Sequence, residues 1–173
     1  MQKRKEKRPL GLNARARLMA AAVIGCYAMS PAWAQLPVPV NATDRMFRWD
    51  GNQLIVTTGG DRVIIPWHSF SIGPGNIVHF TQPSATSAVL NRVSGPDPSF
   101  IYGTLSSNGR VWLINPNGIT IGPGGMVNTA GFIASTLDVS KDNFLAGKLT
   151  FAKGDVARDV VNQGTITSPS GGS

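Results

Sequence analysis

The sequence predicts an all-β protein, and three observations support this fold class. From Gln35 to the end of the 173-residue chain there is no Glu, and strong helix-forming residues are scarce. Gly and Pro recur every several residues, so few windows sustain a helical stripe of apolar side chains. Short alternating or apolar runs separated by turn residues make up most of the rest, as expected for strands.

These runs predict strands, in chain order, at residues 53–57, 62–66, 77–80, 88–93, 110–114, 119–121, 132–135, 148–151, 160–161 and 165–167. Among the connections, Asn108-Gly109 alone suits a tight hairpin turn, because both residue types tolerate positive φ. The other Gly-, Pro- and Asn-rich clusters predict longer corners between the short strands.

Recurring corners favour a parallel β-helix. The pattern Gly-Pro-Gly-x-apolar-Val occurs at residues 73–78 and 122–127, and a weaker similarity links residues 126–134 with 160–167. Short strands separated by repeated Gly and Asn corners are what the stacked turns of a β-helix require. A β-sandwich also fits the number of strands, although it usually has longer ones.

The N-terminus has the pattern of a secretory signal peptide. Basic residues are followed by an apolar run over residues 18–29, which is shorter than the roughly 20 residues that a membrane-spanning helix needs. Pro31 and the small residues Ala32 and Ala34 then provide a cleavage site before Gln35. We expect a signal peptide at residues 1–34 and a mature domain at residues 35–173.

Two alternatives exist for this segment. A buried amphipathic helix would alternate polar and apolar residues, whereas here the two kinds are segregated along the chain. Residues 23–26 also resemble a bacterial lipobox, in which Cys26 would be lipidated. Cleavage after Ala34 would instead remove Cys26, the single cysteine, and leave no disulfide, thiol nucleophile or thiolate metal ligand.

The positive charge is also confined to the N-terminus. The formal charge is +7, and seven of the sixteen Lys and Arg residues lie in the first seventeen positions. The remaining nine cations face eight acidic residues in the rest of the chain. Nucleic-acid binding needs a basic face on the folded part, so this charge distribution argues against it.

The most distinctive motif consists of Asn115, Pro116, Asn117, Gly118 and Ile119, between two apolar strands. Asn at the first position, Pro at the second and Gly at the fourth match the preferences of a type I turn. Asn115 and Asn117 can hydrogen-bond nearby backbone groups. The residues alone are accounted for by a well-formed β-helix corner.

Asn-Pro-Asn-Gly-Ile resembles the hallmark of the haemagglutination-activity, or two-partner-secretion (TPS), domain of filamentous haemagglutinin and related exoproteins. Further blocks resemble the high-molecular-weight-adhesin branch of that family, at residues 67–73, 78–84, 90–93, 101–105, 107–109 and 131–137. The resemblance covers the chain from about residue 44 to the end. It implies a right-handed parallel β-helix with small N-terminal capping strands.

The same resemblance implies a function in secretion. It implies export through the Sec machinery, binding in the periplasm by an outer-membrane β-barrel transporter with periplasmic modules, and delivery to the surface of a Gram-negative bacterium. Family exoproteins continue for many hundreds of residues, so we expect this chain to be a fragment or a truncated frame. Binding to a host surface or carbohydrate would then belong to the missing C-terminal region.

Two departures from the family pattern leave the identity of the transporter open. The Asn-Pro-Asn motif occurs once, and a second, Leu-ending version found in parts of the family is absent. Gly124-Gly125 and Thr129-Ala130 stand where we expect a small apolar residue and Val-Gly. Neither departure disturbs the fold assignment.

Five aromatic residues are expected in the core: Trp67, Phe70, Phe80, Trp112 and Phe132. The alternation of buried and exposed positions slips by one residue between Trp67 and Phe70, which predicts a bend at His68-Ser69.

No residue pattern predicts an enzyme or a cofactor. Polysaccharide-cleaving β-helices need clustered acids or a basic residue, but the Asp residues are scattered, and Asp138/Asp142 and Asp155/Asp159 have helical spacing. His68 and His79 could join a Ser and Asp61 or Asp97, yet no Gly-x-Ser-x-Gly elbow exists. No metal-ligand spacing or phosphate loop is present. A self-sufficient adhesin or carbohydrate-binding module, and a secreted polysaccharide-cleaving β-helix, are the alternative functions.

Overall fold

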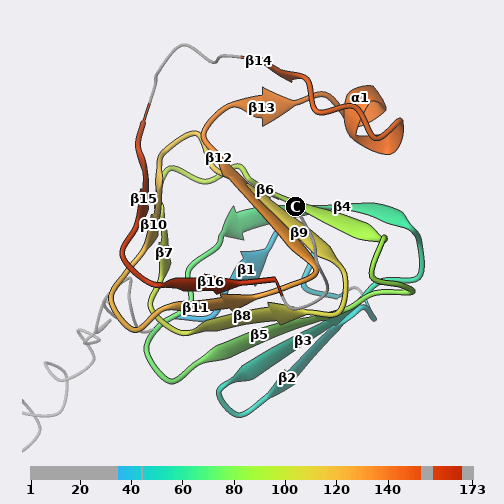
Figure 1. Ribbon diagram of the computed structural model, residues 1–173. Coiled ribbons are helices and arrows are strands. Elements are labelled where there is room, and N and C mark those ends of the chain that lie inside the picture. Colours follow the sequence, from blue (N-terminus) through green and yellow to red (C-terminus); the bar gives the residue numbers. More distant parts are fainter. Residues whose placement is uncertain (1–34, 44, 153–157, 169–173) are drawn as a thin grey trace, which may run out of the picture.

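A computed structural model describes residues 35–43, 45–152 and 158–168, so the expected signal peptide at 1–34 lies outside the described residues. The strands form three larger sheets, which stand as the sides of a triangle in Figure 1. Sheet 1 contains β2 (Phe47–Asp50), β3 (Gln53–Thr57), β5 (Ile77–Thr81), β8 (Thr104–Ser107), β11 (Met126–Asn128) and β16 (Thr165–Thr167). Sheet 2 contains β1 (Val38–Pro39), β4 (Arg62–Ser69), β6 (Ala88–Val93), β9 (Arg110–Ile114) and β12 (Gly131–Ser135). Sheet 3 contains β7 (Ser99–Ile101), β10 (Ile119–Ile121) and β15 (Val160–Asn162).

The chain winds as a parallel β-helix. It passes from sheet 1 to sheet 2 to sheet 3 and returns to sheet 1, so each turn stacks on the one before it. Leu54 pairs with Val78, Val78 with Leu105 and Leu105 with Val127, all in parallel strands. The predicted all-β parallel β-helix is confirmed, and the β-sandwich alternative is wrong.

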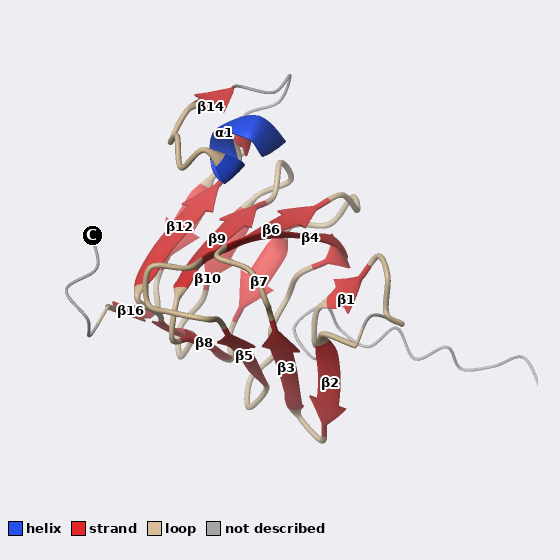
Figure 2. Cartoon of the chain, turned by 90° about the vertical axis from the view of Figure 1, so that its right-hand side faces the viewer, coloured by secondary structure: helices blue, strands red, loops and turns tan. Residues whose placement is uncertain are grey.

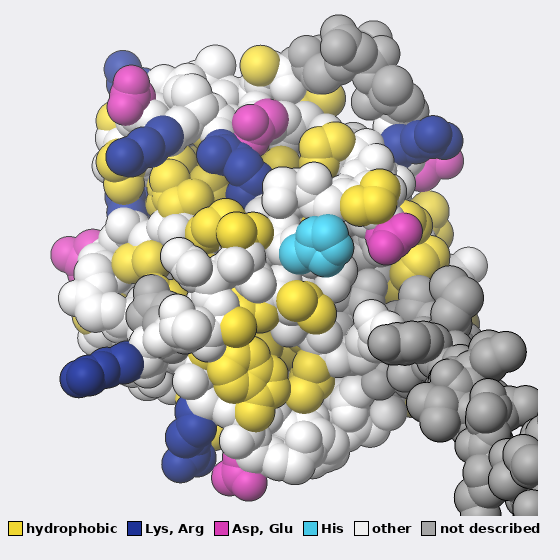
Figure 3. Space-filling view, turned by 180° about the vertical axis from the view of Figure 1, so that it is seen from behind, with side chains coloured by type: hydrophobic (Ala, Val, Ile, Leu, Met, Phe, Trp, Pro, Cys, Tyr) yellow, Lys and Arg dark blue, Asp and Glu magenta, His cyan; other side chains and the backbone are white. Residues whose placement is uncertain are grey.

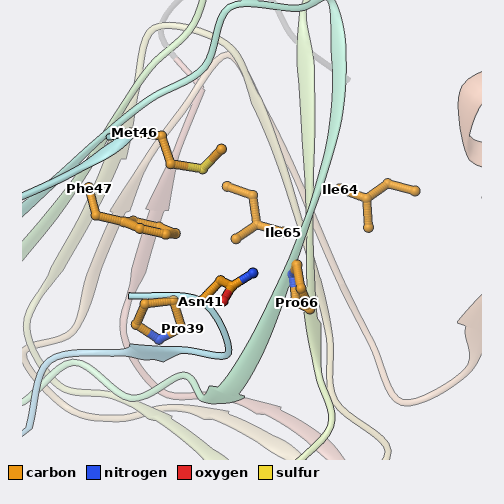
Figure 4. Close-up of a pocket in the computed structure, with 7 residues that line it drawn as sticks. All are labelled: Pro39, Asn41, Met46, Phe47, Ile64, Ile65 and Pro66. Carbon is orange, nitrogen blue, oxygen red and sulfur yellow. The ribbon is translucent and has the colours of Figure 1, made fainter. Parts of the chain in front are cut away.

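Two antiparallel strands close the N-terminal end, as predicted. β1 pairs with β4, and β2 pairs with β3 through a turn in which Gly51 has a φ of 57°. A small pocket beside them is lined by Pro39, Asn41, Met46, Phe47, Ile64, Ile65 and Pro66 (Figure 4). Figure 4 shows Ile65 pointing toward Phe47, whereas Ile64 lies on the other side of β4. Consecutive residues of this strand therefore serve two different apolar environments.

The capping region also leaves apolar side chains in contact with solvent. Val38, Val40 and Trp49 are exposed. Seen from behind, the molecule shows hydrophobic side chains gathered in the lower middle of its surface (Figure 3).

The interior of the β-helix is filled by inward-facing side chains from all three sheets. Trp67, Phe70 and Phe80 are fully or almost fully buried there, and the rings of Trp67 and Phe70 meet edge to face at 5.1 Å. Trp67 and Phe70 face the same interior although they are three positions apart, so the alternation slips between them. Phe132 packs against this core but is only partly buried.

One polar side chain, Asn91, also lies in this interior and is fully buried. Its Oδ1 accepts a hydrogen bond from Nε1 of Trp67 at 2.9 Å, and its Nδ2 donates to the Trp112 carbonyl at 3.2 Å. A buried amide is stable only when such partners are present. Asn91 therefore links three successive turns from inside.

Trp112 is buried, but on the outer face of sheet 2. Val111 and Leu113 point into the β-helix, so the side chain between them points outward. It belongs to an outer cluster of Ala88, Leu90, Trp112, Ile114, Val139 and Phe144. An excursion that leaves the β-helix after β12 covers this cluster, and it contains β13 (Asp138–Val139), α1 (Lys141–Leu145) and β14 (Phe151–Ala152). Figure 2 shows α1 and β14 above the strands of sheet 2.

The helix α1 and several short strands do not appear among the sequence predictions. The missed strands are β7, β8, β11 and β13, whereas β1 and β2 are the expected capping strands, for which no residue bounds were predicted. The strand predicted at 148–151 is wrong except for its last residue, because only Phe151 and Ala152 pair with Val139 and Asp138. Ser140 caps α1 by accepting a hydrogen bond from the Asn143 amide.

Asn108-Gly109 does not form a hairpin. It connects β8 to β9, which belong to different sheets, and neither residue has a positive φ. Glycine is needed here for a different reason, since a Cβ at position 109 would lie 2.6 Å from the side-chain amide of Gln82. That amide donates to Oγ of Ser107 and to the Arg110 carbonyl, both at 2.9 Å. The corner is thus a close packing of two turns.

Within the described residues, no helix has the length and apolar character needed to cross a membrane.

Replacing Asn91 by Ala should lower the free energy of unfolding by about 1–3 kcal/mol, because the buried Nε1 of Trp67 loses its acceptor. Urea denaturation followed by circular dichroism measures this change. The exposed Asn128 on β11 provides the matched control, and Asn128→Ala should change stability by less than about 0.5 kcal/mol. Equal stability of the two variants would contradict the role of Asn91.

Replacing Phe144 by Ala should cost about 3–5 kcal/mol, because its buried ring packs edge to face on Trp112 at 5.0 Å. Chemical denaturation measures the loss, and hydrogen exchange should show it concentrated in the excursion and on β9. Leu145→Ala, at the neighbouring exposed position, should have little effect. A Phe144→Ala variant as stable as the parent would show that the outer cluster adds nothing to the fold.

Candidate functional site

The distinctive motif forms the corner between β9 and β10, where the chain passes from sheet 2 to sheet 3. The amide of Gly118 donates to the Asn115 carbonyl at 3.1 Å and closes the four-residue turn. Gly118 has a φ of 112°, which side-chain-bearing residues rarely adopt. We call residues 115–119 the 115–119 corner.

Asn115 organises this corner from a fully buried position. Its Nδ2 donates to the Asp97 carbonyl at 3.0 Å and to the Ser99 hydroxyl at 2.9 Å, both in the preceding turn of the β-helix. Its Oδ1 accepts from the Asn117 amide at 2.9 Å, which shapes the local turn. One amide side chain thus fixes the corner and holds it to its neighbour.

Asn117 adds a second link to the same neighbouring segment, because its Nδ2 donates to the Gly95 carbonyl at 2.8 Å. The following turn is bound through backbone hydrogen bonds. The backbone amide of Asn115 donates to the Ser135 carbonyl at 3.0 Å, and the backbone amide of Ile119 donates to the Asp159 carbonyl at 3.1 Å. The 115–119 corner therefore joins three turns of the β-helix.

The corner presents little of itself to solvent. Pro116 is exposed and Asn117 is half-buried, whereas Asn115, Gly118 and Ile119 are buried. It contains no titratable side chain, and its amide groups are engaged within the fold. Its arrangement can hold a shape, but it offers no group for acid–base or nucleophilic chemistry.

Sequence analysis missed the partners of the corner, Gly95, Asp97 and Ser99. The segment was recognisable as Gly- and Pro-rich, but its contact with Asn115 was not. A Cβ at Gly95 would lie 2.0 Å from the His68 carbonyl, so this glycine lets three corners stack closely. The only sequence signal for this contact was the spacing, because Gly95 precedes Asn117 by about one turn of the β-helix.

The residues considered for catalysis have separate partners. His79 Nδ1 lies 2.8 Å from the Ser106 hydroxyl, whereas Asp61 accepts from the Ser87 hydroxyl at 3.1 Å. Asp138 pairs with Arg92 at 3.0 Å. Asp155 lies outside the described residues. Over residues 35–43, 45–152 and 158–168, no group of three or more His, Cys, Asp or Glu side chains could hold a metal ion.

Replacing Asn115 by Ala should lower the free energy of unfolding by about 2–3 kcal/mol, because two acceptors and one backbone donor lose a buried partner. Thermal and urea denaturation measure the loss. Pro116→Ala, in the exposed part of the same turn, should change stability by less than about 1 kcal/mol. If the two variants unfolded at the same denaturant concentration, the structural role of Asn115 would be refuted.

Comparisons with known proteins identify the family. The model of the TPS secretion domain family matches residues 39–173. Two Haemophilus influenzae proteins, each named heme/hemopexin-binding protein, are similar to the chain. One is 33% identical over 138 residues, which is 80% of this chain and 15% of that protein. The other, from strain Rd, is 43% identical over 91 residues, which is 53% of this chain and 10% of that protein.

The chain thus matches a small part of these relatives. Among solved structures, the HMW1 secretion domain from Haemophilus influenzae has a TM-score of 0.65 and 44% sequence identity, and the match covers 69% of this chain and 32% of that one. The family match over residues 39–173 includes both the β-helix and the 115–119 corner. The chain belongs to the family of TPS secretion domains, the targeting domains of two-partner-secretion exoproteins.

Proposed function

We propose that this domain is the secretion signal of an exoprotein that reaches the bacterial cell surface. An outer-membrane β-barrel transporter binds it in the periplasm through its periplasmic modules, after Sec has carried the chain across the inner membrane. The observation that carries this proposal is the family match over residues 39–173. The signal-peptide pattern at residues 1–34, with cleavage between Ala34 and Gln35, supports the Sec step.

The build of the β-helix suits export of an extended chain. From Gln35 onward the sequence contains no cysteine, so no disulfide closes a loop that would have to thread a narrow pore. Each turn pairs with the preceding one, so turns can form one after another as the chain emerges. Each completed turn buries apolar surface at roughly 25 cal/mol per Å², which favours forward movement.

Recognition in the periplasm would act on an unfolded or partly folded chain, in which turns of the β-helix can already be in place. An extended strand of the domain would add to a free sheet edge of the transporter's periplasmic modules, with alternate side chains supplying specificity. The heme/hemopexin binding in the names of two relatives belongs to proteins of which the matched part is 15% and 10%. We assign any binding to a host surface or carbohydrate to parts of the exoprotein outside the matched segment.

The experiment has two steps. Purified residues 35–173 should bind the isolated periplasmic modules of the transporter, and a chain of the same composition in scrambled order should not. Equal binding by the scrambled chain would remove the support for recognition. In cells expressing the transporter, Asn115→Ala and Asn117→Ala should reduce export in proportion to their loss of folding stability.

That export prediction has a clear contrary outcome. A variant of Asn115 or Asn117 with the melting temperature of the parent domain, but without export, would mean that the 115–119 corner is a contact surface for the transporter. Pro116→Ala is the matched control, because it changes the exposed part of the corner and leaves its buried hydrogen bonds in place.

A further inference from the structure

A slot lies on the outer face of sheet 2, beside the outer cluster. Its floor contains Ala88 and Gly131, and because these residues are small they leave a depression in the surface of the sheet. Arg62 pairs with Ala88, and Ala88 pairs with Arg110, so the two arginines flank Ala88 from the strands on either side. Two strand spacings separate their Cα atoms by about 10 Å. Two arginine side chains at this distance can converge on one group between them.

Arg62 is held in place before any ligand binds. Its Nη1 donates to the Phe144 carbonyl at 3.1 Å, and its guanidinium carbon lies 5.7 Å from the centre of the Phe144 ring. Gly147 packs against the guanidinium so closely that a Cβ there would lie 2.7 Å from Nη2. These partners are a carbonyl and a ring, so they position the cation without neutralising it. A fixed cation loses little conformational entropy on binding an anion.

Among the described residues, neither arginine of the slot takes part in an ion pair. The acid next in sequence, Asp61, accepts a hydrogen bond from the Ser87 hydroxyl. An anionic group in the slot would relieve the repulsion between the like charges.

The remaining walls of the slot are mostly apolar and include Trp112 and Leu149. A saccharide would need many polar partners for its hydroxyl groups, and these walls supply few. An acidic side chain with an apolar neighbour, carried on a polypeptide, matches both the cations and the apolar walls. The geometry points to a binding site for an acidic polypeptide segment, with its carboxylate between Arg62 and Arg110 and its apolar neighbour against Trp112 and Leu149.

This inference rests on the proposed function in one respect: the polypeptide is a segment of the transporter's periplasmic modules. The chemistry of the site can be tested without the transporter. Hexaglutamate is titrated into the purified chain while the indole N–H resonance of Trp112, assigned with a Trp112→Phe variant, is followed by NMR. The resonance should shift saturably, and Arg110→Gln should weaken the binding roughly tenfold.

The matched control is Arg48→Gln. Arg48 is an exposed arginine on β2, next to Asp50 at 3.6 Å, and its replacement removes the same charge away from the slot. Hexaglutamate binding by Arg48→Gln should stay within about twofold of the parent chain once long-range charge is screened by 0.15 M salt. Arg110 is also exposed, so Arg110→Gln should keep the parent's melting temperature. An equal loss of binding in both variants would overturn the site.

Binding measurements with the transporter's periplasmic modules distinguish this inference from the proposed function. If the periplasmic modules bind the parent chain and Arg110→Gln equally, the slot is not their docking site, although the export function stands. If the modules bind neither chain while hexaglutamate still shifts Trp112, the export proposal fails and the acidic-peptide site stands. A sulfated oligosaccharide that shifts Trp112 at lower concentration than hexaglutamate would overturn the assignment to a polypeptide, as would no shift at millimolar hexaglutamate.

Discussion

In-register parallel pairing between successive turns is the interaction on which the whole domain depends. The turns supply one another with backbone partners and with layers of inward side chains, as in the row from Leu54 to Val127. An unpaired polar group in such a narrow interior costs free energy. Asn91 is accommodated because it lies between the indole of Trp67 and the carbonyl of Trp112, and so bonds to the turns on both sides.

The corners must stack as closely as the strands, and this accounts for much of the unusual composition. At Gly95 and Gly109 a Cβ would meet His68 or Gln82 of the preceding turn, so glycine is required for close approach and not for positive φ. At the 115–119 corner, the side-chain amides of two asparagines add to the backbone hydrogen bonds that hold the neighbouring turns. The motif that resembles the family hallmark thus mainly joins turns, and Pro116 is its exposed residue.

Sheet 2 is buried on both faces, which sets it apart from an ordinary half-exposed sheet. Its inner face contributes to the core, and its outer face carries the cluster that the excursion covers. The excursion does not cover the outer face completely beside Ala88. There it contributes Gly147 and Leu149 to the slot, and the flanking strands contribute arginines. The excursion therefore stabilises the β-helix and also shapes the one slot we interpret as a binding site.

The sequence by itself determined the β class, most of the longer strands, the turn at the 115–119 corner and the family, because these depend on local patterns. Only the tertiary structure decided that Trp112 faces outward, that Asn108-Gly109 is a stacked corner, and that Arg62 and Arg110 share a slot. Apolar character predicts burial, but it does not distinguish the inside of a β-helix from an outer face covered by a later segment. The contacts of Asn115 likewise join residues one turn apart, and the register of that turn is set by the fold as a whole.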